Sequence, residues 1–335
     1  MRSVRTRSRG FIRALLAAAV TSVGSAAYCA PTFAADGYPV KPIRLVVPYS
    51  PGGGSDVVAR IVGLKMAESL GQTIVIDNRP GAAGMLGADL VANALADGYT
   101  LLLADAAFTI NSSYYTKQAR YDALKSFTAV ALIADTPYLL MAHPGVAASN
   151  LKEFIALAKA QPGKINVGSS GTGSGSPLVG ELFKLKAGVN MNHIPYKGAG
   201  PSTADVMAGQ IQATFAGAAG VVALVKSGRL KALVAASAKR TPLLPDVQTF
   251  IEQGFPDLVV TNWYGIAAPA GTPQAVVKRL YGEITRAVAQ PDARERLTNA
   301  ALDPVTPSPE QFRNLIEVEM KRWAQVIKDA NLKTE

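Results

Sequence analysis

Residues 43–56 read IRLVVPYSPGGGSD. The first five, Ile43–Val47, form a continuous apolar run of strand length, and a glycine-rich turn separates them from a helical pattern over 58–70. Ser55 is expected as the N-cap of that helix, and Gly71 is placed to end it. A buried strand that passes through such a turn into a helix is typical of an α/β fold.

The same alternation of strand and helix continues along the chain. Further strands are expected at 73–76, 99–103, 165–168, 191–195, 212–216 and 232–236, and further helices at 85–95, 151–160, 178–186, 202–208, 221–226, 273–289 and 309–330. This alternation predicts a largely parallel sheet with helices on both faces. A second turn rich in serine and glycine, 169–177, precedes the helix at 178–186, and its Pro177 suits a first helical turn.

Two halves that carry the same strand, turn and helix predict two lobes. The first lobe is expected to comprise residues 36–138 and 263–335, and the second residues 139–262. Extended crossover segments near 138–143 and 263–269 would join them. A chain of 335 residues, 49% of them hydrophobic, is long enough to bury a core in each lobe.

Residues 1–34 have the pattern of a secretory signal peptide. Arginines precede a run of apolar and small residues at 14–30, and the first acidic residue is Asp36. The run is too short and too rich in small residues for a comfortable membrane span, and no later segment qualifies. Cleavage is expected between Cys29 and Ala35; a lipid anchor on Cys29 is the alternative, which the bulky residue before it disfavours. The pattern predicts a periplasmic protein.

The basic charge of the chain is partly a property of this leader. The formal net charge is +10, and five of the arginines lie in residues 1–34, which leaves 10 − 5 = +5 on the mature chain. That charge is spread without a basic block, so nucleic-acid binding is disfavoured. Cys29 is the only cysteine, so the mature chain is expected to have neither disulfide nor thiol chemistry.

Both glycine-rich turns are candidate anion-binding sites. Each opens a helix, whose first backbone N–H groups are unpaired and carry a partial positive charge. The turn at 52–56 could bind an anion through its backbone N–H groups, and the turn at 169–176 adds the hydroxyls of its serine and threonine side chains. If two lobes face each other, both helix N-termini meet in the cleft. Each turn can also be read as a simple connection, and Tyr196 and Lys197 fit a ligand contact or a surface position equally well.

Catalytic and nucleotide-binding motifs are missing from the sequence. His143 and His193 are the only histidines, and each is expected to be structural. The chain has no G-x-S-x-G, H-E-x-x-H or phosphate-loop pattern and no paired metal ligands, so neither metal nor cofactor is expected. A secreted hydrolase using Ser170 or Ser174 is a competing hypothesis that lacks a general base. Asp56 could orient a ligand, or could simply complement the helix dipole.

The quoted motifs resemble a known receptor family. YPVKPIR at 38–44 and VVPYSPGGGSD at 46–56 look like the opening of the substrate-binding receptors of tripartite tricarboxylate transporters, also called Bug receptors. DNRPGA at 77–82, HIPYKG at 193–198 and APAGTP at 268–273 extend the resemblance over nearly the whole mature chain. It implies a type II periplasmic-binding-protein fold of two doubly wound lobes, with a hinge and a ligand cleft, and neither cofactor nor catalysis.

The resemblance also implies a ligand and a partner. The ligand would be a small carboxylate, held by backbone amides, hydroxyls and waters, and a monomeric receptor would deliver it to a membrane transporter or, alternatively, dock on a signalling partner. Where the family often has an acid after the strand at 212–216, this chain has Ala216 and Gly217, which favours a plain or aromatic carboxylate over an amino acid. Carried over to this sequence, the ligand-binding residues are Tyr49, Ser50, Gly53, Gly54, Ser55, Asp56, Ala106, Ala107, Ser169, Ser170, Gly171, Thr172, Gly173, Ser174, Ser176, Tyr196, Lys197, Gly198 and Ala216.

Overall fold

The computed structural model of the protein describes residues 37–115, 117–170, 174–196 and 199–329. The predicted signal peptide and Cys29 therefore lie outside the described residues, and export stays a prediction. Within those ranges, no helix is both long and apolar enough to cross a membrane. The residues from Gly37 onward form one compact unit, so the division into lobes at 138 and 263 also stays a prediction.

The first group of strands is parallel. Strand β1 (Ile43–Val47) lies between β2 (Ile74–Asn78) and β3 (Thr100–Asp105). Successive side chains of a strand point to opposite faces, and the apolar residues of β1 and β3 accordingly divide between two hydrophobic cores. Val46 packs with one core and Leu45 with the other. The first core lies under α2 (Met85–Ala92), α3 (Ala106–Tyr114) and α10 (Pro309–Asp329), and the second under α1 (Gly54–Leu70), α8 (Gln274–Ala289) and α9 (Pro291–Asn299). Helices therefore cover both faces, as predicted.

The helices of this first group flank the strands in the chain. They are α1 (Gly54–Leu70), α2 (Met85–Ala92), α3 (Ala106–Tyr114), α8 (Gln274–Ala289), α9 (Pro291–Asn299) and α10 (Pro309–Asp329), with a short 3-10 turn, η2 (Ala82–Gly84), before α2. Gly71 ends α1 in the left-handed conformation, as predicted. The prediction for Ser55 was wrong: Gly53 is the N-cap and Ser55 lies inside the helix, because the helix begins two residues earlier than expected.

A second group of parallel strands repeats the arrangement. Strand β5 (Asn166–Ser169) lies between β6 (Asn192–Pro195) and β7 (Ala213–Gly217), and β8 (Lys231–Ala235) pairs with β4 (Phe127–Ala142). The elements of this group are α4 (Leu151–Ala160), β5 (Asn166–Ser169), α5 (Gly175–Ala187), β6 (Asn192–Pro195), α6 (Ala199–Met207), β7 (Ala213–Gly217), η3 (Ala218–Gly220), α7 (Val222–Lys226) and β8 (Lys231–Ala235). Pro177 lies in the first turn of α5, as predicted.

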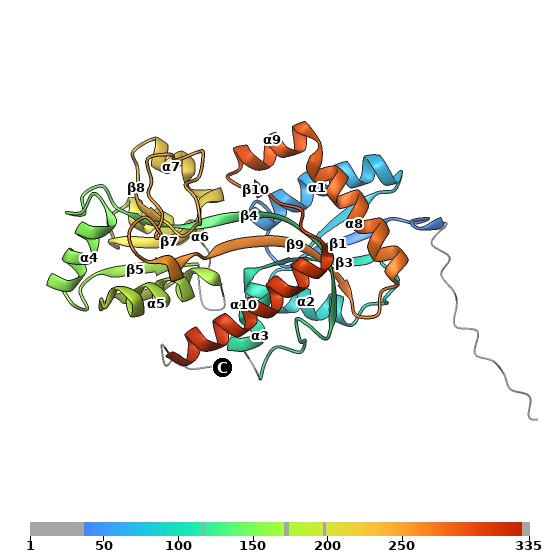
Figure 1. The fold of residues 1–335 in the computed structure, drawn as a ribbon, viewed down its shortest axis with the longest axis horizontal. Helices are drawn as coiled ribbons and strands as arrows, with labels where there is room; N and C mark the ends of the chain where they lie inside the picture. The colour runs from blue at the N-terminus through green and yellow to red at the C-terminus, as the bar shows by residue number, and fades with distance from the viewer. Residues whose placement is uncertain (1–36, 116, 171–173, 197–198, 330–335) are drawn as a thin grey trace, which may run out of the picture. The chain divides into compact units, whose positions relative to one another are not determined.

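Two long antiparallel strands join the groups (Figure 1). Strand β4 (Phe127–Ala142) pairs with β9 (Thr261–Pro269) up to Pro137, and from Tyr138 onward it pairs with β7 and β8. The strand order is β2-β1-β3-β9-β4-β7-β5-β6, and β10 (Asp303–Pro304) adds to β4. The expectation of a largely parallel sheet was therefore wrong at the centre of the sheet, where both crossover strands run antiparallel to their neighbours.

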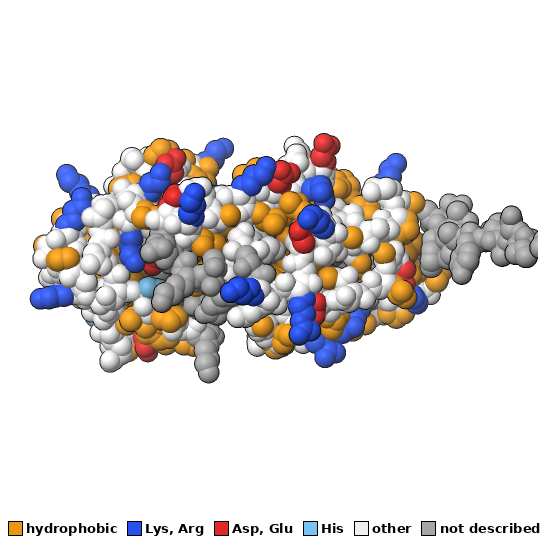
Figure 2. All heavy atoms as spheres, turned by 90° about the horizontal axis from the view of Figure 1, so that it is seen from below, with side chains coloured by type: hydrophobic (Ala, Val, Ile, Leu, Met, Phe, Trp, Pro, Cys, Tyr) orange, Lys and Arg blue, Asp and Glu red, His pale blue; other side chains and the backbone are white. Residues whose placement is uncertain are grey.

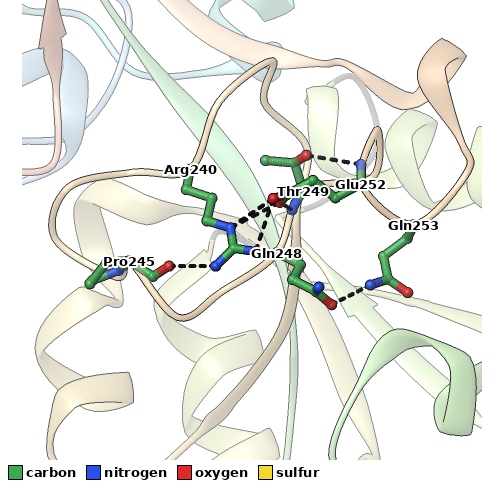
Figure 3. A network of polar contacts seen from close by, with 6 residues as sticks. All are labelled: Arg240, Pro245, Gln248, Thr249, Glu252 and Gln253. Atoms are coloured by element: carbon green, nitrogen blue, oxygen red, sulfur yellow. Dashed lines mark hydrogen bonds and ion pairs between the residues drawn. The ribbon is translucent and has the colours of Figure 1, made fainter.

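A long connection between β8 and β9 is held by polar contacts (Figure 3). Arg240 donates from Nε to Glu252 Oε1 at 2.9 Å and from Nη1 to the carbonyl of Pro245 at 3.0 Å. Glu252 also accepts from the backbone N–H of Thr249 at 2.7 Å. These contacts fold the segment back on itself before η4 (Pro256–Leu258) leads into β9.

Candidate ligand-binding cleft

A cavity of about 600 Å³ lies where the two strand groups face each other. Its wall comes from the turn after β1, the end of β3, the crossover strands β4 and β9, and the starts of α5 and α6. The residues that line it are Tyr49, Gly52, Gly53, Gly54, Ser55, Val57, Asp105, Ala107, Tyr138, Ser170, Ser174, Gly175, Ala199, Gly200, Thr203, Met207, Gly217, Ala219, Gly220, Val221, Leu224, Asn262, Tyr264, Ala300 and Leu302.

Several helices have their first turns at the described part of this cavity wall. The first residues of α1, α3, α5 and α6 contribute Gly54, Ala107, Gly175 and Ala199 to its wall. The N-caps of α1 and α5 make no side-chain capping bond, so backbone N–H groups at these ends are not claimed by a cap. Unpaired N–H groups and the helix dipoles together attract anions.

Each strand group meets a tyrosine from a crossover strand at its glycine-rich helix start. A Cβ on Gly54 would collide with the hydroxyl of Tyr264, and a Cβ on Gly175 would collide with the hydroxyl of Tyr138. Asn262 Nδ2 donates to the Tyr264 hydroxyl at 2.8 Å, which leaves that hydroxyl able to donate to a ligand. Because these two positions are glycine, the Tyr264 hydroxyl can lie against the N-terminus of α1 and the Tyr138 hydroxyl against the N-terminus of α5.

Asp105 is the one charged residue among the described residues of the cavity wall. It is 8% exposed and caps α3, where Oδ1 accepts from the Tyr49 hydroxyl at 2.9 Å and from the backbone N–H of Ala107 at 3.2 Å. Burial raises the pKa of its carboxyl to about 6, and the hydrogen bonds from Tyr49 and the backbone oppose that rise. The described wall thus combines neutral donors, apolar surface and a single weakly acidic carboxyl.

Seven of the residues predicted for the site line this cavity. They are Tyr49, Gly53, Gly54, Ser55, Ala107, Ser170 and Ser174. They come from both strand groups, so the structure brings the two glycine-rich turns to one cavity. Five further predicted residues, Gly171, Thr172, Gly173, Lys197 and Gly198, lie outside the described residues.

Asp56 is not among the residues of the cavity wall and instead holds the turn before α1. Its oxygens accept from the backbone N–H of Gly52 at 3.0 Å, from Arg60 Nε at 2.8 Å and from Asn78 Nδ2 at 3.1 Å. Burial raises the pKa of this carboxyl, but the bonds from Arg60 and Gly52 outweigh burial and lower it overall. The Asp56 side chain therefore stabilises the glycine-rich turn from outside the cavity wall.

The other predicted residues also support the cavity rather than line it. Ser176 accepts from the backbone N–H of Ser170 at 2.8 Å, and Tyr196 donates to Asp205 at 2.6 Å. Ser50 is exposed, whereas Ala106 and Ala216 are fully buried. Ser169 is buried and contacts His193 at 2.6 Å between Oγ and Nε2.

This serine and histidine pair does not form a nucleophilic site at the cavity. Ser169 is 1% exposed, and both residues line a separate small pocket beside α5. No histidine belongs to the described wall of the main cavity, so Ser170 and Ser174 have no imidazole base there. Among the described residues, no cluster of three or more histidine, cysteine, aspartate or glutamate side chains could hold a metal ion.

Sequence reasoning missed the crossover part of the wall. Asp105, Tyr138, Thr203, Asn262 and Tyr264 were not predicted. Tyr138 and Tyr264 lay in segments read as crossovers, and a residue that faces a cleft there has no local pattern. Thr203 lines the wall, and its hydroxyl is buried without a hydrogen-bond partner among the described residues.

Residues 58–332 match the family described as the tripartite tricarboxylate transporter family receptor. The chain belongs to this family. The receptor is 35% identical over 320 residues to Protein BugT of Bordetella pertussis, an alignment that covers 95% of this chain and 98% of the relative. Receptors of this family bind substrates and are not enzymes.

Solved structures place the fold among periplasmic binding proteins. The receptor is similar to R. palustris Rpa4515 with adipate, at 31% identity and a TM-score of 0.81, with 88% of this chain and 98% of the other covered. It is also similar to MatC from Rhodopseudomonas palustris with bound malate, at 34% identity and a TM-score of 0.78, with 87% and 100% covered. The predicted family and fold are confirmed.

Proposed function

We propose that this receptor is exported to the periplasm, binds a small carboxylate in the cleft and delivers it to a membrane transporter of the tripartite tricarboxylate type. One observation carries the proposal: the N-termini of α1, α3 and α5 and several hydroxyls surround one cavity of about 600 Å³. Related structures hold malate and adipate, which are dicarboxylates of a size that such a cavity accommodates.

The available donors are sufficient for micromolar affinity. Binding at that level needs about 8 kcal/mol. A hydrogen bond to a charged group contributes roughly 1.5 to 3 kcal/mol net, so a few backbone N–H groups from α1 and α5 with the tyrosine hydroxyls supply enough, even after the entropic cost of association. An arginine clamp is not required.

The cavity also bears on the choice between plain carboxylates and amino acids. The end of β7 offers no acid, since Ala216 and Gly217 stand there. Asp105 nevertheless supplies a carboxyl from the end of β3, so the cleft is not without an acid. Acidic amino acids therefore belong in the ligand panel beside dicarboxylates, tricarboxylates and aromatic carboxylates, and plain carboxylates remain our proposal.

A thermal-shift and calorimetric screen tests carboxylate binding. Malate, adipate, citrate, nicotinate and glutamate are titrated into the mature protein, and we expect at least one carboxylate to raise Tm and to compact the molecule in small-angle scattering. Tyr264→Phe removes a cleft hydroxyl and should weaken that binding by about five- to twentyfold. Tyr281→Phe, which removes a hydroxyl distant from the cavity wall, is the matched control. Unchanged Tm across the whole panel would contradict the proposal.

The transporter partner, the exported state and the monomer are tested separately. N-terminal sequencing of the periplasmic fraction should show cleavage between Cys29 and Ala35, and native mass spectrometry should show one copy. Crosslinking in membranes with ligand present should recover integral transporter subunits. Recovery of a signalling protein instead would favour the sensor hypothesis.

On the face shown in Figure 2, Lys and Arg are scattered among Asp and Glu, which supports the expectation of no nucleic-acid partner.

A further inference from the structure

We propose that ligand capture is coupled to protonation of Asp105, so that a bound carboxylate and a neutral Asp105 share the cleft. The inference rests on the proposed function and adds a regulation of the same site. It predicts that the receptor takes up a proton from solvent as it binds its ligand.

The position of Asp105 makes its ionisation sensitive to a ligand. The side chain is buried at the end of β3, and it lines the cavity that would hold the carboxylate. The bonds from the Tyr49 hydroxyl and the Ala107 N–H both end on Oδ1. A proton on Oδ2 would therefore leave these two bonds in place, whereas the backbone N–H groups of Phe108 and Asp105, which also bond to the carboxyl, oppose its protonation.

No described group is placed to neutralise an ionised Asp105. The titratable groups around it are the phenols of Tyr49, Tyr121, Tyr138 and Tyr264, from the β1–α1 turn, the segment before β4, and β4 and β9. Burial raises the pKa of each phenol, so all four remain neutral. No Lys, Arg or His belongs to the described part of the cavity wall.

A ligand anion adds a second negative charge to this site. Two carboxylates in one desolvated cavity repel, and one of them then binds a proton. In the free receptor, burial already raises the pKa of Asp105 to about 6, so the carboxyl is mostly ionised at pH 7.5. The bound anion raises that pKa further, and the buffer supplies the proton.

The coupling has a defined pH dependence. Between pH 6 and the higher pKa of the complex, the dissociation constant should rise by up to tenfold per pH unit. We expect on the order of tenfold weaker binding of the best carboxylate at pH 7.5 than at pH 5.5. Asp105→Asn keeps an oxygen acceptor for Tyr49 and Ala107 and cannot ionise, so it should bind with the same affinity at both pH values.

Calorimetry in two buffers of different ionisation enthalpy measures the proton directly. Malate is the first probe, followed by whichever panel carboxylate binds best, at pH 5.5, 6.5 and 7.5. Wild-type protein at pH 7.5 should take up close to one proton per ligand, and Asp105→Asn none. Asp135→Asn is the matched control, because burial also raises the pKa of Asp135 to about 6 while its side chain lies opposite Asp303 and outside the cavity wall. That control should keep the wild-type uptake.

The outcomes separate the two proposals. Carboxylate binding with no proton uptake, or with proton release as an ammonium ligand would cause, overturns the coupling and leaves the receptor function standing. Uptake that persists in Asp105→Asn assigns the proton elsewhere and also overturns it. No binding of any carboxylate at any of the three pH values overturns the proposed function and the coupling together. If Asp105→Asn does not fold, the buffer dependence of the wild-type and Asp135→Asn proteins still decides.

Discussion

Asp105 is a buried carboxyl in the cavity wall, and its ionised form lowers the free energy of unfolding. Its environment favours the neutral acid, because burial removes the carboxylate from water and no described cation compensates. Asp56 is the opposite case at the same cavity: Arg60 and Asn78 hold its carboxylate, and its pKa is lowered. Asp56 therefore holds the turn before α1, whereas Asp105 lines the cavity.

The stability of Asp105→Asn relative to wild type should therefore rise with pH. The folded-state pKa lies above the unfolded value, so the carboxyl stabilises the fold at low pH, and this stabilisation is lost as pH rises through about 6. From pH 4 to pH 7.5, the unfolding free energy of the variant should gain about 3 kcal/mol on wild type. Urea unfolding at several pH values measures the difference.

A surface carboxyl supplies the control for that experiment. Lys321 lowers the pKa of Glu317 by a hydrogen bond on the exposed face of α10. The difference between Glu317→Gln and wild type should therefore stay flat above pH 5. A similarly flat difference for Asp105→Asn would show that Asp105 is ionised in the folded state at low pH, contrary to the burial argument.

Helix starts are the elements that define the cleft, and local sequence predicted several of them. The turns before α1 and α5 could be predicted because a cluster of glycine and serine between an apolar run and a helical pattern indicates a turn that opens a helix. Helix α3 was missed because it follows β3 with no intervening loop, and its cap is the last strand residue, Asp105. Because the N-cap is also the last residue of the strand, no loop in the sequence marks where the helix begins.

Gly54→Ala should destabilise the receptor through the first turn of α1. The added Cβ meets the Tyr264 hydroxyl, so the ring must shift and the bond from Asn262 is strained. We expect a loss of about 1–3 kcal/mol in unfolding free energy, typical of overpacking in a well-packed region.

The control lies in the first turn of another helix at the same cavity. A Cβ on Gly200, at the start of α6, would meet no atom of the described residues within 4 Å. Gly200→Ala should therefore leave stability unchanged or slightly raised, since alanine favours helix. Equal losses in the two variants would point to a general requirement for glycine at these helix starts and against a specific contact with Tyr264.

At the scale of the whole molecule, the crossover strands were the hardest feature to predict. The segment 127–142 is almost wholly apolar, and a long strand that changes partners at Tyr138 follows from tertiary pairing rather than from local pattern. Two similar parallel groups were foreseen, whereas their antiparallel junction was not. For the same reason Tyr138 and Tyr264, which face the cleft from that junction, escaped the sequence reasoning.

Helix α10 should restrain this junction through Arg322. Its guanidinium donates to the carbonyl of Val259 at 2.7 Å and to that of Asp257 at 2.9 Å, just before β9, and Lys186 of α5 pairs with the Asp257 side chain at 2.6 Å. Arg322→Met keeps much of the stem but removes both donors, so we expect a loss of about 1–3 kcal/mol in unfolding free energy.

Hydrogen exchange tells this restraint apart from general destabilisation. The backbone N–H of Val260 bonds to the carbonyl of Ala236 at 2.9 Å, and its exchange should quicken in Arg322→Met more than that of amides in β1. Lys321→Met, which removes only an exposed pair within α10, should change neither quantity measurably. Uniform quickening across the sheet would instead mean that Arg322 contributes to global stability alone. Local quickening would show that Arg322 stabilises the segment just before β9 in particular.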